Sequence, residues 1–265
     1  MKNWLLAATL IPSGLALAAT DSLPCLIDPS EVVSLGSPVV GVLDRIVVER
    51  GDIVKRNQII AELSAEVERK SVELASGRAN DLAELQAAAA AREHAQREKQ
   101  RALQLFEKQL ISKQIADQAV TEHSLAEHKY QQAKSNLSQA KLELGLTKAQ
   151  LEQRILRSPI DGIVVDRFTS AGQRIQDQPL VKIAKVNPLK VEVIVPAEHY
   201  NKLNVGDEGQ ITPSLPGFTA QTATIRIVDR IIDPASNTFR VTLELPNPKH
   251  AIPAGSRCTA SLDLK

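Results

Sequence analysis

The chain has 265 residues, with 32 Lys and Arg against 31 Asp and Glu and a formal net charge of +1. This balance disfavours binding to nucleic acid or to an anionic lipid surface, since both depend on excess positive charge. Aromatic residues make up only 3% of the chain, which is few for a compact enzyme core or for stacking on bases. The length favours about two domains.

The N-terminus is typical of an export signal. Lys2 precedes an apolar stretch from Trp4 to Leu17, and Ala16 to Ala18 offers a small-x-small cleavage site. We therefore expect residues 1–18 to be a cleavable signal peptide. An uncleaved membrane anchor is the alternative, which the proline and glycine inside the apolar stretch disfavour. Cys25 does not follow the small residues directly, so no lipid anchor is expected.

The two cysteines lie near opposite ends of the expected mature chain, at Cys25 and Cys258. Export places them in an oxidising compartment, where cysteines commonly pair. We predict a disulfide that ties an N-terminal extended segment, residues 19–35, to the last strand of the chain. Two free, buried thiols are the alternative.

Residues 36–63 and residues 158–187 contain the same pattern. Near the start of each, Ser-Pro-Val-Val-Gly-Val-Leu-Asp-Arg recurs as Ser-Pro-Ile-Asp-Gly-Ile-Val-Val-Asp-Arg, and Gly51 recurs as Gly172 at the same offset. Valine and isoleucine between glycine-containing turns predict short strands in both copies. Because neither copy is long enough to bury a core alone, the two are expected to pack together as a small sandwich.

Residues 64–157, between the two copies, have the features of a helical hairpin. Ser64 and Ser112 are suitable N-caps, and each precedes a proline-free run rich in good helix formers. The first helix is expected to reach Leu110, and the second to reach about Arg157. In the second helix two rows repeat every seven residues, as in a coiled-coil seam; they are Ala119, Ala126, Ala133, Ala140 and Thr147, and Ala116, His123, Tyr130, Leu137, Leu144 and Leu151.

The first helix carries a looser row that would face the second. Arg92 and Lys99 interrupt it, and their aliphatic stems can flank the partner helix while the charges reach water. The row itself consists of Leu85, Ala88, Ala95, Ala102 and Phe106.

Residues 188–265 change to a pattern of short strands separated by turn residues, which is typical of a small antiparallel barrel. A single short helix is expected from Pro196 to Leu203. The expected strands run from Leu189 to Val195, Glu208 to Thr212, Thr222 to Val228, Thr238 to Leu245 and Cys258 to Leu264.

This order of segments resembles the periplasmic adaptor, or membrane fusion (HlyD-like), family of tripartite efflux pumps, in a short form. The repeated halves look like a split lipoyl or biotinyl hammerhead with an inserted coiled-coil hairpin. Asp-Pro-Ala-Ser-Asn-Thr-Phe-Arg-Val at Asp233, Leu-Pro-Asn-Pro at Leu245 and Ile-Pro-Ala-Gly at Ile252 look like the family's barrel. The resemblance implies an elongated, multi-domain α+β fold. Larger members continue into a membrane-proximal domain, which we expect to be absent or vestigial here.

The resemblance also implies a docking site at the hairpin tip. The family uses an arginine, a leucine four residues later and a serine seven beyond that to dock on a TolC-like channel, and Arg101, Leu105 and Ser112 occupy those positions. Leu110 and Ile111 would expose apolar surface in the loop between the helices, which favours a partner. The alternative is that Leu105 packs in the seam, Arg101 is a solvated charge and Ser112 is only a helix cap.

The function implied by the family is that of a non-enzymatic periplasmic adaptor. It would bridge an inner-membrane transporter of the RND type to a TolC-like outer-membrane channel, with several copies associating into a ring. An adaptor of an ABC-type transporter or of a type I secretion system is an alternative within the same class.

Two other classes compete with the adaptor. A lipoyl or biotinyl carrier would need a modified lysine at a tight hairpin, a position that the helical segment replaces. A metal carrier would need ligands, yet the only methionine is the initiator and the five histidines show no zinc-type spacing. No catalytic triad or phosphate loop is present. We therefore expect no cofactor, no metal and no catalytic residues.

Overall fold

The computed structural model of the protein describes residues 22–264. Two compact units make up this part of the chain. One contains residues 22–33, 161–163 and 183–264, and the other contains residues 34–160 and 164–182. The expected signal peptide lies outside the described residues. Between residues 22 and 264, none of the helices combines the length and apolar character needed to cross a membrane.

The first unit is a β-barrel, as the sequence predicted. Its strands follow one another in the order β1-β12-β9-β10-β11-β8, and a further pairing of β1 with β8 closes the ring. The expected short helix is the 3-10 helix η1 (Ala197–Lys202). The strands are β1 (Ser22–Gly36), β8 (Pro179–Pro196), β9 (Glu208–Pro213), β10 (Gln221–Val228), β11 (Thr238–Leu245) and β12 (Ser256–Leu262).

Alternating residues fill the barrel. In β8, Val191, Val193 and Val195 are fully buried while the residues between them are not. Val193 lies opposite Val241 of β11, which is also fully buried. This period of two is what a strand with one buried face requires. The N-terminal segment, which the sequence only predicted to be extended, is itself a barrel strand.

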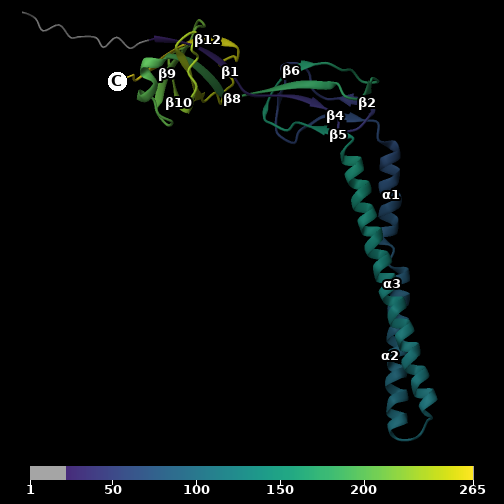
Figure 1. Cartoon of the computed structure of the whole chain (residues 1–265). Helices are drawn as coiled ribbons and strands as arrows, with labels where there is room; N and C mark the ends of the chain where they lie inside the picture. The colour runs from purple at the N-terminus through teal and green to yellow at the C-terminus, as the bar shows by residue number, and fades with distance from the viewer. Residues whose placement is uncertain (1–21, 265) are drawn as a thin grey trace, which may run out of the picture. The chain divides into compact units, whose positions relative to one another are not determined.

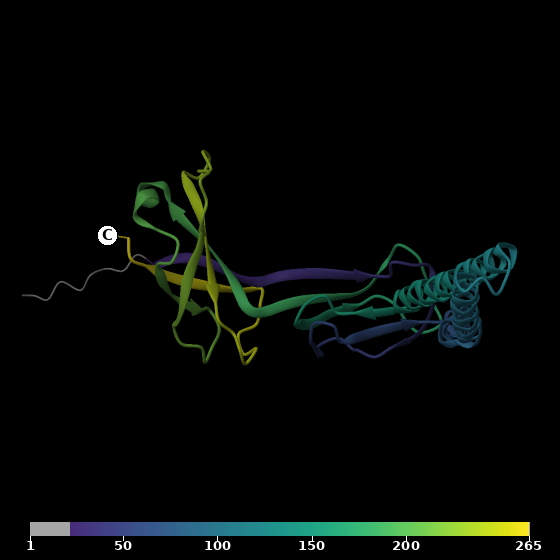
Figure 2. The ribbon, with the colours of Figure 1, turned by 90° about the horizontal axis from the view of Figure 1, so that it is seen from below.

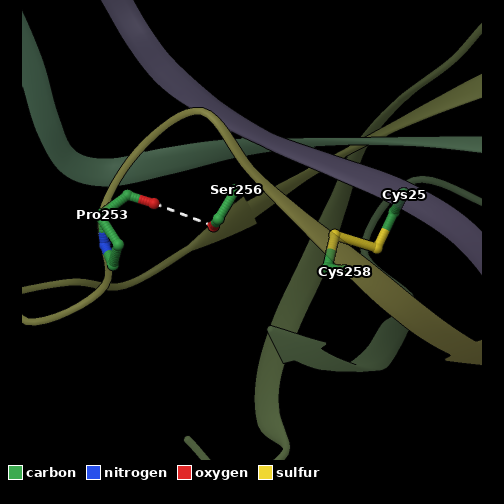
Figure 3. The surroundings of a disulfide bond; sticks show 4 residues. All are labelled: Cys25, Pro253, Ser256 and Cys258. Atoms are coloured by element: carbon green, nitrogen blue, oxygen red, sulfur yellow. Dashed lines mark hydrogen bonds between the residues drawn. A yellow bond between two sulfur atoms is a disulfide. The ribbon is translucent and has the colours of Figure 1, made fainter. Parts of the chain in front are cut away.

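The predicted disulfide is present in this unit. Strands from the two ends of the chain, β1 and β12, lie side by side (Figure 2) and pair antiparallel with Cys25 opposite Cys258. The Cα atoms of the two cysteines are 4.8 Å apart and their sulfur atoms are bonded (Figure 3). Both side chains are buried. The bond therefore joins strands that already pair through their backbones.

In the second unit, the two repeated segments pack together as expected. One sheet has the strand order β5-β4-β2-β7 and so takes strands from both copies. Its core is a buried cluster of Leu43, Ala61, Leu63, Leu156, Ile175 and Leu180, again from both. The strands are β2 (Gly41–Ile46), β3 (Ile53–Val54), β4 (Ile59–Leu63), β5 (Ile155–Arg157), β6 (Gly162–Arg167) and β7 (Arg174–Ile175).

The two copies are joined by reciprocal hydrogen bonds. The Gly51 N–H donates to the carbonyl oxygen of Val164 at 2.8 Å, and the Gly172 N–H donates to that of Leu43 at 2.7 Å. Leu43 and Val164 are equivalent positions of the repeat. Both glycines have positive φ angles, of 95° and 86°, which a side chain would strain. The same turn at the same offset thus fixes each half against the other.

The inserted segment is a helical hairpin made of three helices, α1 (Glu66–Asn80), α2 (Ala83–Glu107) and α3 (Lys113–Glu152). Figure 1 shows α3 running alongside first α2 and then α1, and both of those helices contact it. Three boundaries differ from the prediction, and one of them is the end of α2, which comes at Glu107 and not at Leu110. The first helix is interrupted after Asn80, and the second ends at Glu152, because residues 155–157 form β5 instead.

The start of the hairpin also differs from the prediction. Ala65, not Ser64, holds the N-cap position of α1, and no side chain caps it. The Ser64 N–H instead donates to the carbonyl oxygen of Val42 at 2.8 Å. Ser64 therefore continues the strand pairing of the second unit, and the helix begins one residue later.

The interruption after Asn80 follows from a change of register. In α1, Ala75 and Ala79 are buried, and the same spacing of three and four would next place residues 82 and 86 towards α3. Instead Leu85 and Ala88 are the next half-buried residues. Residues 80–82 are therefore surplus to the seam and leave the helix. The Asp81 carboxylate accepts a hydrogen bond from the Ala83 N–H at 3.0 Å and so helps α2 to begin.

The predicted rows of α3 are those that face its partners. Ala116 and Ala133 are buried and the remaining row members are half-buried. Arg92 of α2 differs in detail from the expectation. Its guanidinium does not simply reach water but lies over the ring of Tyr130, 4.4 Å from the centroid. Its Nε atom is 3.6 Å from Glu127 Oε2.

Arg154 anchors the base of the hairpin to the β5-β4-β2-β7 sheet. Its guanidinium pairs with Glu68 of α1 at 2.6 Å and donates to the carbonyl oxygen of Val40 at 2.9 Å. Its own carbonyl oxygen accepts from the Leu63 N–H at 2.8 Å. Gly41 leaves room for this arrangement, because a Cβ atom there would lie 2.7 Å from the Arg154 Nη1.

A second ion pair lies within the same sheet. Arg45 Nη2 is 2.7 Å from Glu62 Oε1, and the Glu62 side chain is largely buried while that of Arg45 is exposed. The hydrogen bond and the charge of Arg45 lower the pKa of the Glu62 carboxyl, although its burial acts in the opposite direction. Glu62 is therefore held in its ionised form.

Candidate docking site

The tip of the hairpin is a five-residue connection between α2 and α3 (Figure 1). The Leu110 N–H donates to the carbonyl oxygen of Leu105 at 2.9 Å, and the Gln109 N–H donates to that of Phe106 at 2.8 Å. Gln109 has a φ of 58°. These two bonds and the left-handed residue make a Schellman motif, which ends a helix and turns the chain sharply. The loop is therefore held in one conformation by its backbone.

Ser112 caps the next helix, as expected. Its side-chain oxygen accepts a hydrogen bond from the Ile115 N–H at 3.4 Å, and its backbone is extended as an N-cap requires. The residue is exposed. Ser112 therefore has a structural role as a helix cap, and a contact with a partner would be an additional role.

Arg101 and Leu105 lie on the surface of α2. The Arg101 guanidinium pairs with Glu98 one turn earlier at 2.9 Å, and its side chain is 65% exposed. Leu105 is 41% exposed, whereas Ala102, on the predicted seam, is half-buried. Leu105 is thus not enclosed by α3, which weakens the interpretation that it serves only the seam.

The loop residues differ from each other. Leu110 is 67% exposed, while Ile111 is half-buried. Further apolar residues near the tip are exposed that the sequence analysis did not assign to the site. Phe106 was placed on the seam, and Leu103 and Ile115 were not singled out. Their position within about two turns of the loop could have indicated that they belong to the site. We call Leu103, Leu105, Phe106, Leu110 and Ile115 the tip surface.

Cations surround the tip surface. Arg101, Lys108 and Lys113 are exposed there, against Glu107 within the same stretch. An apolar surface with surplus positive charge at the end of a hairpin fits a partner that offers an apolar groove with acidic groups beside it. Elsewhere in residues 22–264, His, Cys, Asp and Glu side chains nowhere gather in threes as a metal site would require.

No protein-family model matches the sequence. A curated relative, the UPF0194 membrane protein in the asrC 5′ region of Acidithiobacillus ferridurans, is 26% identical over 144 residues. The match covers 50% of this chain and 43% of that protein, so it spans less than half of the relative's length.

Solved structures resemble the chain over most of its length. MacA from Actinobacillus actinomycetemcomitans superposes with a TM-score of 0.73 at 20% identity, covering 91% of this chain and 78% of that one. The chain has the fold of the membrane fusion proteins. The membrane fusion protein Spr0693 from Streptococcus pneumoniae R6 superposes with a TM-score of 0.62 at 16% identity, over 92% of this chain and 99% of that one. The membrane fusion fold expected from the sequence, with its β-barrel and its helical region, is thus confirmed.

Proposed function

We propose that this protein is a non-enzymatic periplasmic adaptor of an efflux system, and that the tip surface of its hairpin docks on an outer-membrane channel. The membrane fusion fold supports the adaptor role. The observation that carries the docking role is the exposure of Leu105 and Leu110 at the end of a hairpin whose α3 is 40 residues long. Exposed apolar side chains at the end of a hairpin do not contribute to the packing of this unit, so they favour contact with a partner.

Docking would follow the helix-in-groove mode. Leu105 and Leu110 pack into an apolar groove of the channel, Ile111 supports the loop from beneath, and Arg101 exchanges Glu98 for an acidic group of the partner. Ser112 caps α3 and lies beside the same contact. Each contact is small, so several copies arranged in a ring would supply the affinity through avidity.

At the other end of the system we propose an inner-membrane transporter of the RND type as the second partner. Adaptors of ABC-type or type I secretion systems are the alternative, and the identity of a cross-linked transporter distinguishes them. A lipoyl or biotinyl carrier is disfavoured because the hairpin stands where the modified lysine would be. Mass spectrometry of the mature chain tests this directly, since a carrier gains the mass of its cofactor.

The docking role is tested by cross-linking in cells. Both native cysteines are in the disulfide, so a cysteine introduced as Gln109→Cys is the single reactive thiol among the described residues. Cross-linking through it should capture an outer-membrane channel. Gln86→Cys, exposed on α2 far from the tip, is the matched control and should not. A tip cysteine that reacts with the cross-linker but captures no channel would refute the docking role.

A further inference from the structure

Between its two ends, the outer face of α3 carries no charged residue. Most charged residues of this helix lie on the flanks of its seam, where Glu127 pairs with Arg92 and Glu143 with Arg78, and the exceptions are Asp117 and Glu152 near its two ends. The positions that point away from α1 and α2, from Gln118 to Ala149, are all exposed, and they hold only Gln, Ser, Thr, His, Leu, Gly and Ala. We call this set the outer face. A solvated helix surface is normally rich in charged residues, so this composition is unusual.

The rest of the hairpin shows the usual pattern. The outward side of α2 carries charged residues such as Glu93 and Arg97, which pair at 2.5 Å one turn apart. The outer face of α3 instead exposes large apolar side chains, with Leu125, Leu142 and Leu146 between 58% and 73% exposed. The absence of charge is therefore specific to one side of the hairpin.

Gly145 has no role inside the fold. A Cβ atom at this position would meet nothing within 4 Å, although glycine weakens a helix interior. It lies between Leu142 and Leu146 on the outer face. A position without a side chain lets the backbone of another helix approach closely, as small residues do where helices pack tightly.

One row beside the middle of the outer face, continued to the C-cap residue Gln153, reads the same in both directions. Every seventh residue gives Gln, Leu, Gln, Gln, Leu and Gln, and these residues are Gln118, Leu125, Gln132, Gln139, Leu146 and Gln153. Reversal of this row places leucine on leucine and glutamine on glutamine. Such self-complementarity is what a two-fold, isologous contact between identical antiparallel helices requires.

We propose that two copies of this chain associate through the outer faces of α3, antiparallel about a two-fold axis that passes beside Ser135. Leu125 of each copy packs on Leu146 of the other, and Gln132 pairs with Gln139. Gly145 then faces Ser124, and both are small enough for close helix approach. The charged flanks of α3 stay in water at the rim.

The lack of charge on the outer face disfavours other binding partners. A lipid surface with anionic headgroups would need cations, which this face lacks. The outward side of α2 in a neighbouring copy would bring its charges onto an uncharged surface, where they lose hydration without gaining partners. The occupant must also be a long, straight helix, and α3 itself has the matching length.

The contact involves fewer residues than the roughly 20–30 per partner of a standard stable interface. The dimer should therefore be weak and reversible. Its geometry puts the two hairpin tips at opposite ends, so both cannot dock on one channel. If the proposed function holds, this dimer is the free form of the adaptor, and docking in a ring replaces it.

Site-directed disulfide trapping of the mature, disulfide-bonded protein tests the arrangement. Ser135→Cys should form a covalent homodimer under mild oxidation, because the two copies of residue 135 meet at the axis. Leu125→Cys alone should not, because its counterpart in the second copy lies about 30 Å away along the helices. A mixture of Leu125→Cys and Leu146→Cys proteins should give the mixed dimer. Dimers of Leu125→Cys alone would indicate parallel helices and overturn the proposal.

Sedimentation of the unmodified protein is the second measurement. We expect a monomer–dimer equilibrium that Leu125→Glu with Leu146→Glu shifts to monomer by at least tenfold, with unchanged helical content because both side chains are exposed. Sedimentation as a monomer at every concentration up to about a millimolar would refute the proposal. Channel capture by Gln109→Cys does not depend on either result, so the docking role and the dimer fail separately.

Discussion

The guanidinium of Arg92 lies over the ring of Tyr130, 4.4 Å from its centroid, at the level of the hairpin where the seam of α2 is interrupted by charge. A cation on an aromatic face contributes about 0.5–1 kcal/mol at a partly exposed site. Arg92→Ala should therefore lower the free energy of unfolding by about that amount more in the wild type than in the Tyr130→Leu variant. A urea-unfolding double-mutant cycle measures the coupling, and Arg97→Ala, on the outward side of α2, is the control. A coupling energy near zero would mean that the ring and the cation are independent.

Arg101→Asp tests the electrostatic part of docking. Arg101 is exposed and pairs only with a neighbour one turn away, so the change should alter stability by less than about 0.5 kcal/mol. Efflux and channel capture should nevertheless fall sharply, because the charge that faces the partner is reversed. Lys134→Asp, on a flank of α3 far from the tip, is a matched charge reversal that should leave capture intact. Normal efflux in the Arg101→Asp strain would contradict the assigned role.

Leu105→Asp tests the apolar part. The side chain is 41% exposed, so a soluble, helical protein is expected, with loss of channel capture. If Leu105 instead serves packing, the variant should lose helical content or unfold at a lower temperature. Circular dichroism with thermal melting, measured on the same preparation as the capture assay, separates the two outcomes.

Thr169 and Val48 occupy equivalent positions in the two halves of the repeat, and both are buried. The Thr169 hydroxyl has no hydrogen-bond partner among the described residues. Replacing it by the residue that the other half uses, Thr169→Val, should raise the free energy of unfolding by about 1 kcal/mol, since an unsatisfied buried hydroxyl is removed at nearly constant shape. Thr169→Ser, which keeps the hydroxyl and loses the methyl group, should destabilise. Denaturant unfolding that ranks Val below Thr would show that the hydroxyl is satisfied.

Glu62 makes part of the stability dependent on pH. Its pKa is lowered by Arg45, so the ionised form is favoured by folding. The stabilisation is present above the ordinary carboxyl value near 4.5 and is lost as the pH falls through the lower folded value. Glu62→Gln should therefore be less stable than the wild type at pH 7 and should approach it as the pH falls below that folded value. A difference that stays constant across this range in urea-unfolding experiments would exclude the ionic contribution.

Much of this fold could be predicted because the sequence contains a duplicated β segment and a regular heptad pattern. The equivalence of Gly51 and Gly172 indicated that the halves meet, and the heptads of α3 gave the residues that face its partners. The end of α3 could not be predicted, since Leu151 to Arg157 contains good helix formers. Leu156 nevertheless enters the buried cluster of the sheet, and this tertiary packing outweighs helix propensity.

Two other features had no clear signal. The surplus residues after Asn80 cannot be recognised in an Ala- and Glu-rich stretch, because such residues fit either side of a seam. The change of register becomes apparent only when α1 and α2 are packed against α3. The exposure of Leu105 was likewise undecidable, since a leucine next to a seam packs or projects according to where the partner helix ends. The tip could be located from the sequence, whereas the conformation of its loop depends on the αL turn at Gln109.

The disulfide between Cys25 and Cys258 should contribute strongly to the stability of the barrel. The two residues are 233 positions apart in sequence, so in the chain-entropy model closing that loop stabilises the folded state by roughly 5 kcal/mol. The measured value should be smaller, because helical structure that persists in the unfolded chain shortens the effective loop. Cys25→Ser with Cys258→Ser is the appropriate comparison, since reduction alone leaves two thiols in a buried site. We expect the double variant to unfold at lower denaturant concentration while α1, α2 and α3 retain their helical signal, because the bond lies entirely within the barrel unit. Equal stability of the two proteins, or two thiols titrating in the denatured, unreduced wild type, would show that the bond does not form in the cell.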